Sequence, residues 1–291
     1  MAVRHVLAAA IFASAAISAH AQDVTAQSLL DKNLEARGGA QALNAVKAIR
    51  FKGKMIFPGD FELAYSEIRA HGGSDGIEAR MEGDVQGLTY MQGYDGQTAW
   101  RVNPFQGRKD AETMSADEAR SMADSSRVAG VLQDARSDGS TITYLGREDF
   151  DGTSAYKLKV TQKDGDEFTY LLDPDTFLEI KITETRKVRG APQTSETELG
   201  DYEKVGGVYF PMSVESWSQG QSNQRQRILI DSAQANPAIT PALFAEPKGR
   251  ATSMIGGEPP DASNKQPDDA QPDKPGPTQP ENPSEPKGEQ K

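Results

Sequence analysis

The chain has 291 residues, no cysteine, three histidines and a formal net charge of −11. The lack of cysteine excludes thiol catalysis, disulfides and cysteine-ligated metal clusters. The acidic balance argues against nucleic acid as a partner, because phosphate binding needs clustered Lys and Arg. We therefore expect no cofactor, no metal site and no nucleic-acid partner.

The first 21 residues have the pattern of a secretory signal peptide. A basic start over residues 1–4 precedes an alanine-rich apolar run over residues 6–17, and Ala19-His20-Ala21 fits the small-x-small cleavage site. The apolar run is too short to span a membrane, and no cysteine follows for lipid attachment. We predict cleavage after Ala21 and a monomeric periplasmic protein without stable membrane insertion.

The last 36 residues differ from the rest of the chain. Residues 256–291 contain nine of the 17 prolines, eight acidic against four basic residues, and no aromatic residue. Such a segment buries too little apolar surface to offset the entropy of ordering. We predict a disordered, Pro-rich acidic tail and a single folded domain over residues 22–255.

Two short helices are predicted at the start of the domain. Apolar residues at helical spacing follow a cap at Thr25 or Asp23, and Gly38-Gly39 ends this first helix. A spacing of three then predicts a second helix from Ala40, Leu43, Val46 and Ile49.

The remainder reads as strands joined by tight turns. Apolar and polar residues alternate over successive segments, and Asp-Gly or Gly-Gly pairs between several of them favour two-residue hairpins. The predicted strands are residues 50–57, 61–65, 77–81, 88–94, 97–102, 141–147, 154–162, 167–172, 177–188, 196–204 and 208–217.

One helical segment interrupts the strands. Residues 109–137 contain the capping box Ser115-x-x-Glu118 and an intermittent apolar face. The expected fold class is therefore α+β. A strongly curved antiparallel sheet of about 11–12 strands, an incomplete β-barrel, carries an N-terminal helix and inserted lid helices.

Catalytic or metal-binding patterns are weak in this sequence. The acidic segments Asp173-Pro174-Asp175 and 164–167 do not continue as a calcium loop and fit hairpin turns instead. His71, the one histidine beyond the signal segment, lies in a Gly-rich loop without a nucleophile motif nearby. We predict that the protein is not an enzyme.

Apolar side chains on the strands and the inserted helices are the candidate ligand-binding residues. The mouth of a curled sheet is a favoured pocket position, and methionines suit a surface that repacks around flexible chains. The alternative is an ordinary hydrophobic core. The candidates are Phe51, Met55, Phe57, Phe61, Leu63, Tyr65, Met81, Trp100, Met114, Met122, Val131, Leu132, Leu158, Val160, Ile180, Ile182 and Trp217.

Several segments, in this order, resemble the LolA-like superfamily of periplasmic lipoprotein-sorting carriers and their relatives. They cover residues 22–247 and comprise Ala36-Arg37-Gly38-Gly39 with a Phe-x-Gly strand, the 93–104 hairpin, 156–160 with Leu172-Asp173-Pro174, the 201–211 hairpin, and 238–247. The resemblance implies a half-barrel with helices as a lid over a hydrophobic cavity. It also implies a strand arginine that latches the lid, for which Arg50, Arg69, Arg80 and Arg101 are candidates. The Pro-rich tail departs from the pattern.

Two functions follow from these observations. The first is a non-enzymatic periplasmic carrier or binder of lipid or lipoprotein acyl chains, whose partner is a lipid or a lipidated protein. The alternative is a periplasmic sensor or interaction module that engages envelope proteins without transporting a ligand. An enzyme using two convergent carboxylates is a third possibility, but the sequence does not identify such a pair.

Overall fold

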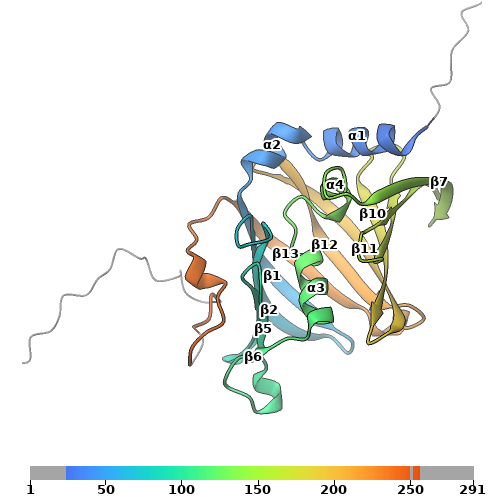
Figure 1. Ribbon diagram of the computed structural model, residues 1–291. Helices are drawn as coiled ribbons and strands as arrows, with labels where there is room; N and C mark the ends of the chain where they lie inside the picture. The colour runs from blue at the N-terminus through green and yellow to red at the C-terminus, as the bar shows by residue number, and fades with distance from the viewer. Residues whose placement is uncertain (1–23, 250–251, 256–291) are drawn as a thin grey trace, which may run out of the picture. The chain divides into compact units, whose positions relative to one another are not determined.

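A computed structural model of the chain describes residues 24–249 and 252–255 (Figure 1). The predicted signal peptide and Pro-rich tail lie outside the described residues. Within the described part, no helix is long and apolar enough to cross a membrane.

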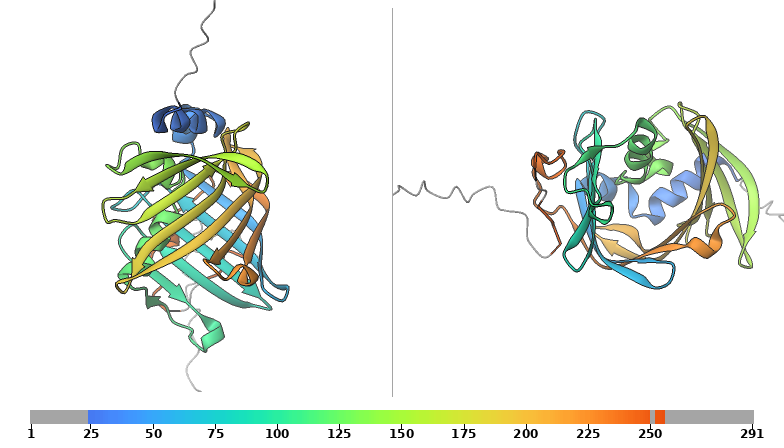
Figure 2. Two further views of the ribbon diagram at one scale, coloured as in Figure 1. Left: turned by 90° about the vertical axis from the view of Figure 1, so that its right-hand side faces the viewer. Right: turned by 90° about the horizontal axis from the view of Figure 1, so that it is seen from below.

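The domain is built on one antiparallel sheet of 13 strands, in the order β6-β5-β4-β3-β2-β1-β13-β12-β11-β10-β9-β8-β7. The two edge strands, β6 and β7, do not pair with each other, so the curved sheet stays open (Figure 2). The strands are β1 (Ala48–Phe57), β2 (Phe61–Ala70), β3 (Glu78–Val85), β4 (Leu88–Tyr94), β5 (Ala99–Val102), β6 (Glu112–Thr113), β7 (Thr141–Phe150), β8 (Thr153–Thr161), β9 (Glu167–Leu172), β10 (Glu179–Val188), β11 (Ala191–Val205), β12 (Val208–Ser218) and β13 (Gln226–Ala235).

The helices form two groups. Helices α1 (Ala26–Ala36) and α2 (Gly39–Ala45) lie across one end of the sheet, and α3 (Ala116–Ser125) and α4 (Val131–Asp134) lie on its concave side (Figures 1 and 2). Thr25 and Ser115 cap α1 and α3, each with a reciprocal capping box. We call residues 116–134 the helical insertion. The predicted α+β half-barrel with an N-terminal helix and inserted helices is confirmed.

Three details differ from the sequence-based expectation, the smallest being the two-residue strand β6 inside the segment 109–137 that was predicted as helical. The second helix ends at Ala45, and Ile49 belongs to β1, because Val46 adopts an extended conformation. Strand β13 was not predicted. Its consecutive apolar residues Ile228, Leu229 and Ile230 give no alternation, yet it pairs with both β1 and β12 in the middle of the sheet.

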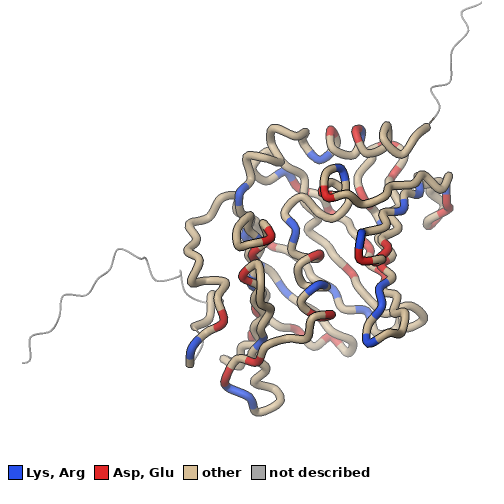
Figure 3. The backbone as a smooth tube through the Cα atoms, in the orientation of Figure 1, with Lys and Arg blue, Asp and Glu red and all other residues tan. Residues whose placement is uncertain are grey.

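Charged residues of both signs are intermingled along the described chain (Figure 3). Over the predicted domain, residues 22–255, the formal charge is −8, because −11 includes −4 from residues 256–291 and +1 from residues 1–21. The acidic balance therefore does not mark one face as a binding surface.

A close backbone contact in the middle of the sheet requires a glycine. Gly53 lies where β1 shifts register against β13, and a β carbon there would be 2.0 Å from the Leu229 carbonyl oxygen. Overpacking of this kind costs about 1–3 kcal/mol. We expect Gly53→Ala to lower the free energy of unfolding by that amount, as measured by urea denaturation.

Gly200 provides the matched control for this substitution. It also lies within a strand, but the nearest atom to its added β carbon would be the Ser213 Cβ at 4.0 Å. We expect Gly200→Ala to change the free energy of unfolding by no more than about 0.5 kcal/mol. Equal losses in the two variants would show that the contact with Leu229 is not what requires Gly53.

Candidate functional site

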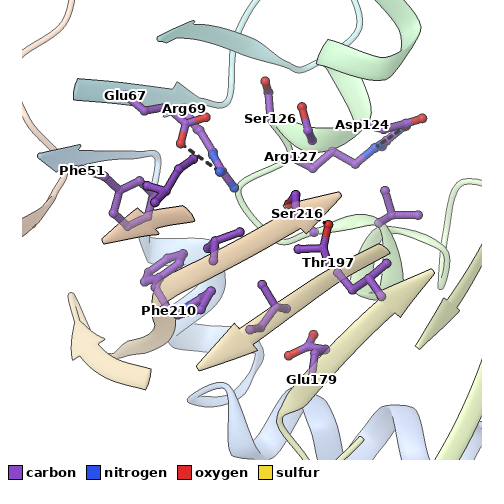
Figure 4. A pocket seen from close by; sticks show the side chains of 18 of the residues that line it. Phe51, Glu67, Arg69, Asp124, Ser126, Arg127, Glu179, Thr197, Phe210 and Ser216 are labelled. Atoms are coloured by element: carbon purple, nitrogen blue, oxygen red, sulfur yellow. Dashed lines mark hydrogen bonds and ion pairs between the residues drawn. The ribbon is translucent and has the colours of Figure 1, made fainter. Parts of the chain in front are cut away.

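A cavity of about 380 Å³ lies between the concave face of the sheet and the helical insertion (Figure 4). Its sheet side takes residues from β1, β2, β3 and β4 and from β9 to β13, while its opposite side takes residues 122–132 of the insertion. Eight of the predicted ligand-binding residues line it: Phe51, Met55, Tyr65, Met81, Met122, Val131, Leu132 and Ile182.

The other predicted residues lie elsewhere in the fold. Phe57 and Leu63 pack in the core cluster around β1 and β2, and Met114 packs against the buried side chains of β4 and β5. Leu158 and Val160 are fully buried beneath α1 and α4. Phe61 is exposed at the β1–β2 hairpin.

Both tryptophans lie away from the cavity. The Trp100 indole is fully buried, and its Nε1 donates to the Phe244 carbonyl oxygen at 2.7 Å. Trp217 packs against the Arg225 guanidinium, 3.9 Å from its ring centroid. Because neither indole lines the cavity, the intrinsic fluorescence of the protein is a poor reporter of cavity occupancy.

A bulge in β10 explains the position of Ile180. Glu179 pairs with Leu172 and Lys181 with Leu171, so one extra residue is accommodated in β10. A bulge shifts the in-out alternation by one position. Glu179 and Ile182 consequently both line the cavity, and Ile180 does not.

The apolar part of the cavity is centred on two aromatic rings. Phe51 of β1 and Phe210 of β12 meet edge to face, with ring centroids 5.7 Å apart. Ile228 and Ile230 of β13 lie between these strands and also line the cavity. Sequence reasoning missed both isoleucines because it did not predict β13, although the Ile-Leu-Ile run was a usable signal.

A polar triad lies on β2, where alternation places Tyr65, Glu67 and Arg69 on the cavity face. The Tyr65 hydroxyl donates to Glu67 Oε2 at 2.7 Å, and Arg69 Nη2 donates to the same oxygen at 2.9 Å. Burial raises the pKa of the Tyr65 hydroxyl well above its ordinary value, with a further contribution from the Glu67 charge. Tyr65 therefore stays a neutral donor to Glu67 at physiological pH.

A second polar group joins α1 to the sheet. Arg37, which ends α1, pairs with Glu179 of β10 at 3.2 Å and donates to the Tyr209 carbonyl oxygen at 2.8 Å. The Tyr202 hydroxyl donates to the Glu179 carbonyl oxygen at 2.7 Å. Arg37, Glu179 and Tyr202 all line the cavity, so the position of α1 is tied to the cavity wall.

Ion pairs also hold the insertion to the sheet. Asp124 of α3 binds Arg127 at 3.2 Å and Arg186 of β10 at 3.4 Å. Asp166 approaches Arg186 at 3.4 Å from the start of β9. Burial raises the pKa of Asp166, and it also raises the pKa of Glu184, which pairs with Arg186.

Asp124 and Asp166 are two buried carboxylates close to one guanidinium, which bears on the enzyme hypothesis. Both bind Arg186, and Asp166 does not line the cavity. This arrangement joins α3 to β10 and to the start of β9. Glu184, which also pairs with Arg186, lines the cavity together with Asp124. Among the residues that the structure describes, no group of three acidic or histidine side chains is placed to hold a metal.

The four candidate latch arginines occupy different environments. Arg69 enters the cavity, while Arg80 lies on the opposite face of the sheet beside Glu82. Arg50 alternates with the cavity-lining Phe51 on β1, and its Nε and Nη2 are buried without a hydrogen-bond partner in the described structure. Arg101 of β5 binds Glu118 of α3 at 2.6 Å, so it is the one of the four that pairs with the insertion.

The fold is an incomplete antiparallel barrel. Its helices cover a cavity that has both apolar and polar walls. No protein-family model and no curated protein matches the amino-acid sequence. Among solved structures, the chain is similar to a DUF1329 family protein from Desulfovibrio piger, with 14% identity over 76% of this chain and 97% of that chain and a TM-score of 0.54.

The comparison with solved structures gives two further matches. One is a domain described as an outer membrane lipoprotein-sorting protein from Vibrio parahaemolyticus, with 12% identity over 74% of this chain and 97% of that chain and a TM-score of 0.49. The other is a LolA superfamily protein from Nitrosomonas europaea, with 16% identity over 76% and 98% of the two chains and a TM-score of 0.48. At these identities the similarity concerns the fold alone, and that fold, an open antiparallel half-barrel with helices, is the one that the sequence resemblance implied.

Proposed function

We propose that this chain is a non-enzymatic periplasmic carrier or binder of lipid or lipoprotein acyl chains. The observation that carries the proposal is the cavity of about 380 Å³, apolar along β1, β12 and β13 and covered by the helical insertion. Burying a methylene group stabilises a complex by about 0.8 kcal/mol, so an acyl chain gains affinity from such a wall. The sequence segments that resemble those of the lipoprotein-sorting carriers support the same function.

Blocking the cavity tests this function. Ile228 lines the cavity beside Met55, its paired residue on the neighbouring strand β1. Ile228→Trp places a larger side chain in the cavity wall. We expect the purified chain to bind a fluorescent long-chain acyl probe, with emission rising to saturation. We expect Ile228→Trp to weaken that binding at least about tenfold, a change of about 1.4 kcal/mol.

The neighbouring residue on the same strand supplies the control. Leu229 does not line the cavity, so Leu229→Trp makes a similar change of volume outside it. We expect this variant to bind the probe as the unmodified chain does. If the unmodified chain does not bind the probe, or if both variants lose binding equally, the cavity is not an acyl-chain site, and the interaction-module alternative takes precedence.

A further inference from the structure

The Arg69 guanidinium has hydrogen-bonding capacity to spare inside the cavity. Its Nη2 is bound to Glu67, its Nε has no hydrogen-bond partner in the described structure, and 31% of the side chain is exposed. Figure 4 shows the guanidinium extending from β2 beyond the Phe51 ring, and its central carbon lies 5.6 Å from that ring's centroid. The Nε itself is buried, so a ligand meets the exposed part of the guanidinium, where an acceptor atom gains a charge-assisted hydrogen bond.

The charges around the cavity are already paired. Arg69 binds Glu67 at 2.9 Å, and two further ion pairs, Arg37 with Glu179 and Arg127 with Asp124, each have a distance of 3.2 Å. An ionised ligand would bring an unmatched charge into this space, and desolvating an unmatched charge opposes binding. A neutral acceptor can accept a hydrogen bond from Arg69 without the cost of desolvating an unmatched charge.

The cavity volume restricts the ligand further. About 380 Å³ lies near the lower end of the range of roughly 300–1,000 Å³ in which proteins enclose one drug-sized molecule. This space suits one hydrocarbon chain with a small polar end. It does not suit the several chains of a multiply acylated protein anchor.

We propose, on the basis of the proposed function above, that the ligand is a single-chain lipid whose polar end is an uncharged ester or amide. Its carbonyl oxygen accepts a hydrogen bond from the Arg69 guanidinium. Its hydrocarbon chain lies along Phe51, Met55 and Ile228. Glu67 keeps Arg69 in place and cancels its charge, so that the cavity selects a carbonyl over a carboxylate.

Three ligands of equal chain length test this selectivity on the full chain: a fatty acid, its methyl ester and the corresponding alkane. Competition with a fluorescent acyl probe at a pH where the fatty acid is ionised gives the three affinities. We expect the ester to bind about tenfold more tightly than the ionised acid. Equal affinities, or tighter binding of the acid, would overturn the proposal while leaving acyl binding established. If all three fail to bind, the proposed function fails as well.

Substitutions on β2 separate charge from hydrogen bonding. Glu67→Gln keeps an acceptor for Tyr65 and Arg69 but leaves the guanidinium charge unmatched, so we expect the preference to reverse in favour of the fatty acid. Arg69→Met removes the donor, so we expect the ester to lose its advantage over the alkane. Circular dichroism establishes that each variant is folded.

Glu62→Gln is the matched control, because it removes the same charge from the same strand outside the cavity. Glu62 pairs with Lys54, and about half of each side chain is exposed. We expect this variant to keep the ester preference. A reversal in Glu62→Gln as well would show that net charge, and not the Arg69 environment, sets the selectivity.

Discussion

Glu82→Ala is expected to lower the free energy of unfolding by about 3–5 kcal/mol, the cost of removing one partner from a buried ion pair. The Glu82 side chain is fully buried, and it lies 2.6 Å from Arg80 Nη2, whose side chain is 8% exposed. Alanine would leave the Arg80 charge buried without its carboxylate. Urea denaturation of the full chain measures the loss.

Unfolding of Glu82→Ala should begin at one segment of the chain. We call residues 239–249 and 252–255, which run along the sheet face opposite the cavity (Figures 1 and 2), the outer strap. Glu82 Oε2 accepts hydrogen bonds from the Met254 backbone N–H at 2.6 Å and from the Ser253 hydroxyl at 2.8 Å. Arg80 Nη1 donates to the Leu243 carbonyl oxygen at 3.1 Å. We expect limited proteolysis to cut the outer strap of Glu82→Ala first.

An exposed ion pair gives the comparison for Glu82. Glu62 and Lys54 are 3.2 Å apart but about half exposed, and such pairs contribute about 0–1 kcal/mol. We therefore expect Glu62→Ala to leave the urea midpoint nearly unchanged. A loss below about 1 kcal/mol for Glu82→Ala would contradict the prediction and show that the outer strap does not depend on this carboxylate.

The outer strap also explains why some cavity residues could not be predicted from the sequence. Alternation identifies a cavity face only where the other face is exposed to solvent. In β5, Trp100 and Val102 are buried on the face opposite the cavity, and Phe244 packs onto that side of the sheet. Strands buried on both faces lose the alternating pattern, so Trp100 looked like a cavity residue from sequence alone.

Other parts of the fold were predictable because the signals are local. The Thr25 and Ser115 caps, and the turn at Gly206-Gly207 with both φ angles positive, depend on residues a few positions apart. The polar groups of the cavity were not predictable in this way. Arg37 meets Glu179 across 142 positions, through a β10 bulge that no sequence pattern marked.

Breaking the ion pair between Arg37 and Glu179 should also lower the free energy of unfolding by a large amount. Glu179→Ala is expected to cost about 3–5 kcal/mol, because it leaves Arg37, whose side chain is 8% exposed, without its carboxylate. Tyr202 loses one of its two contacts with Glu179 but keeps the 2.7 Å hydrogen bond to the backbone carbonyl. Urea denaturation measures the loss, and the circular dichroism of the folded baseline shows whether α1 remains helical.

The double variant Arg37→Met/Glu179→Ala distinguishes the charge effect from lost packing. Replacing both members of a buried pair by apolar groups removes the uncompensated charge, and such replacements are often neutral or stabilising. We expect the double variant to be more stable than Glu179→Ala alone, even though it also lacks the Arg37 hydrogen bond to the Tyr209 carbonyl oxygen. Arg37→Met alone completes the comparison. If its loss and that of Glu179→Ala simply add in the double variant, Arg37 and Glu179 act independently, and α1 is held to the cavity wall by apolar packing around Leu29 and Leu30.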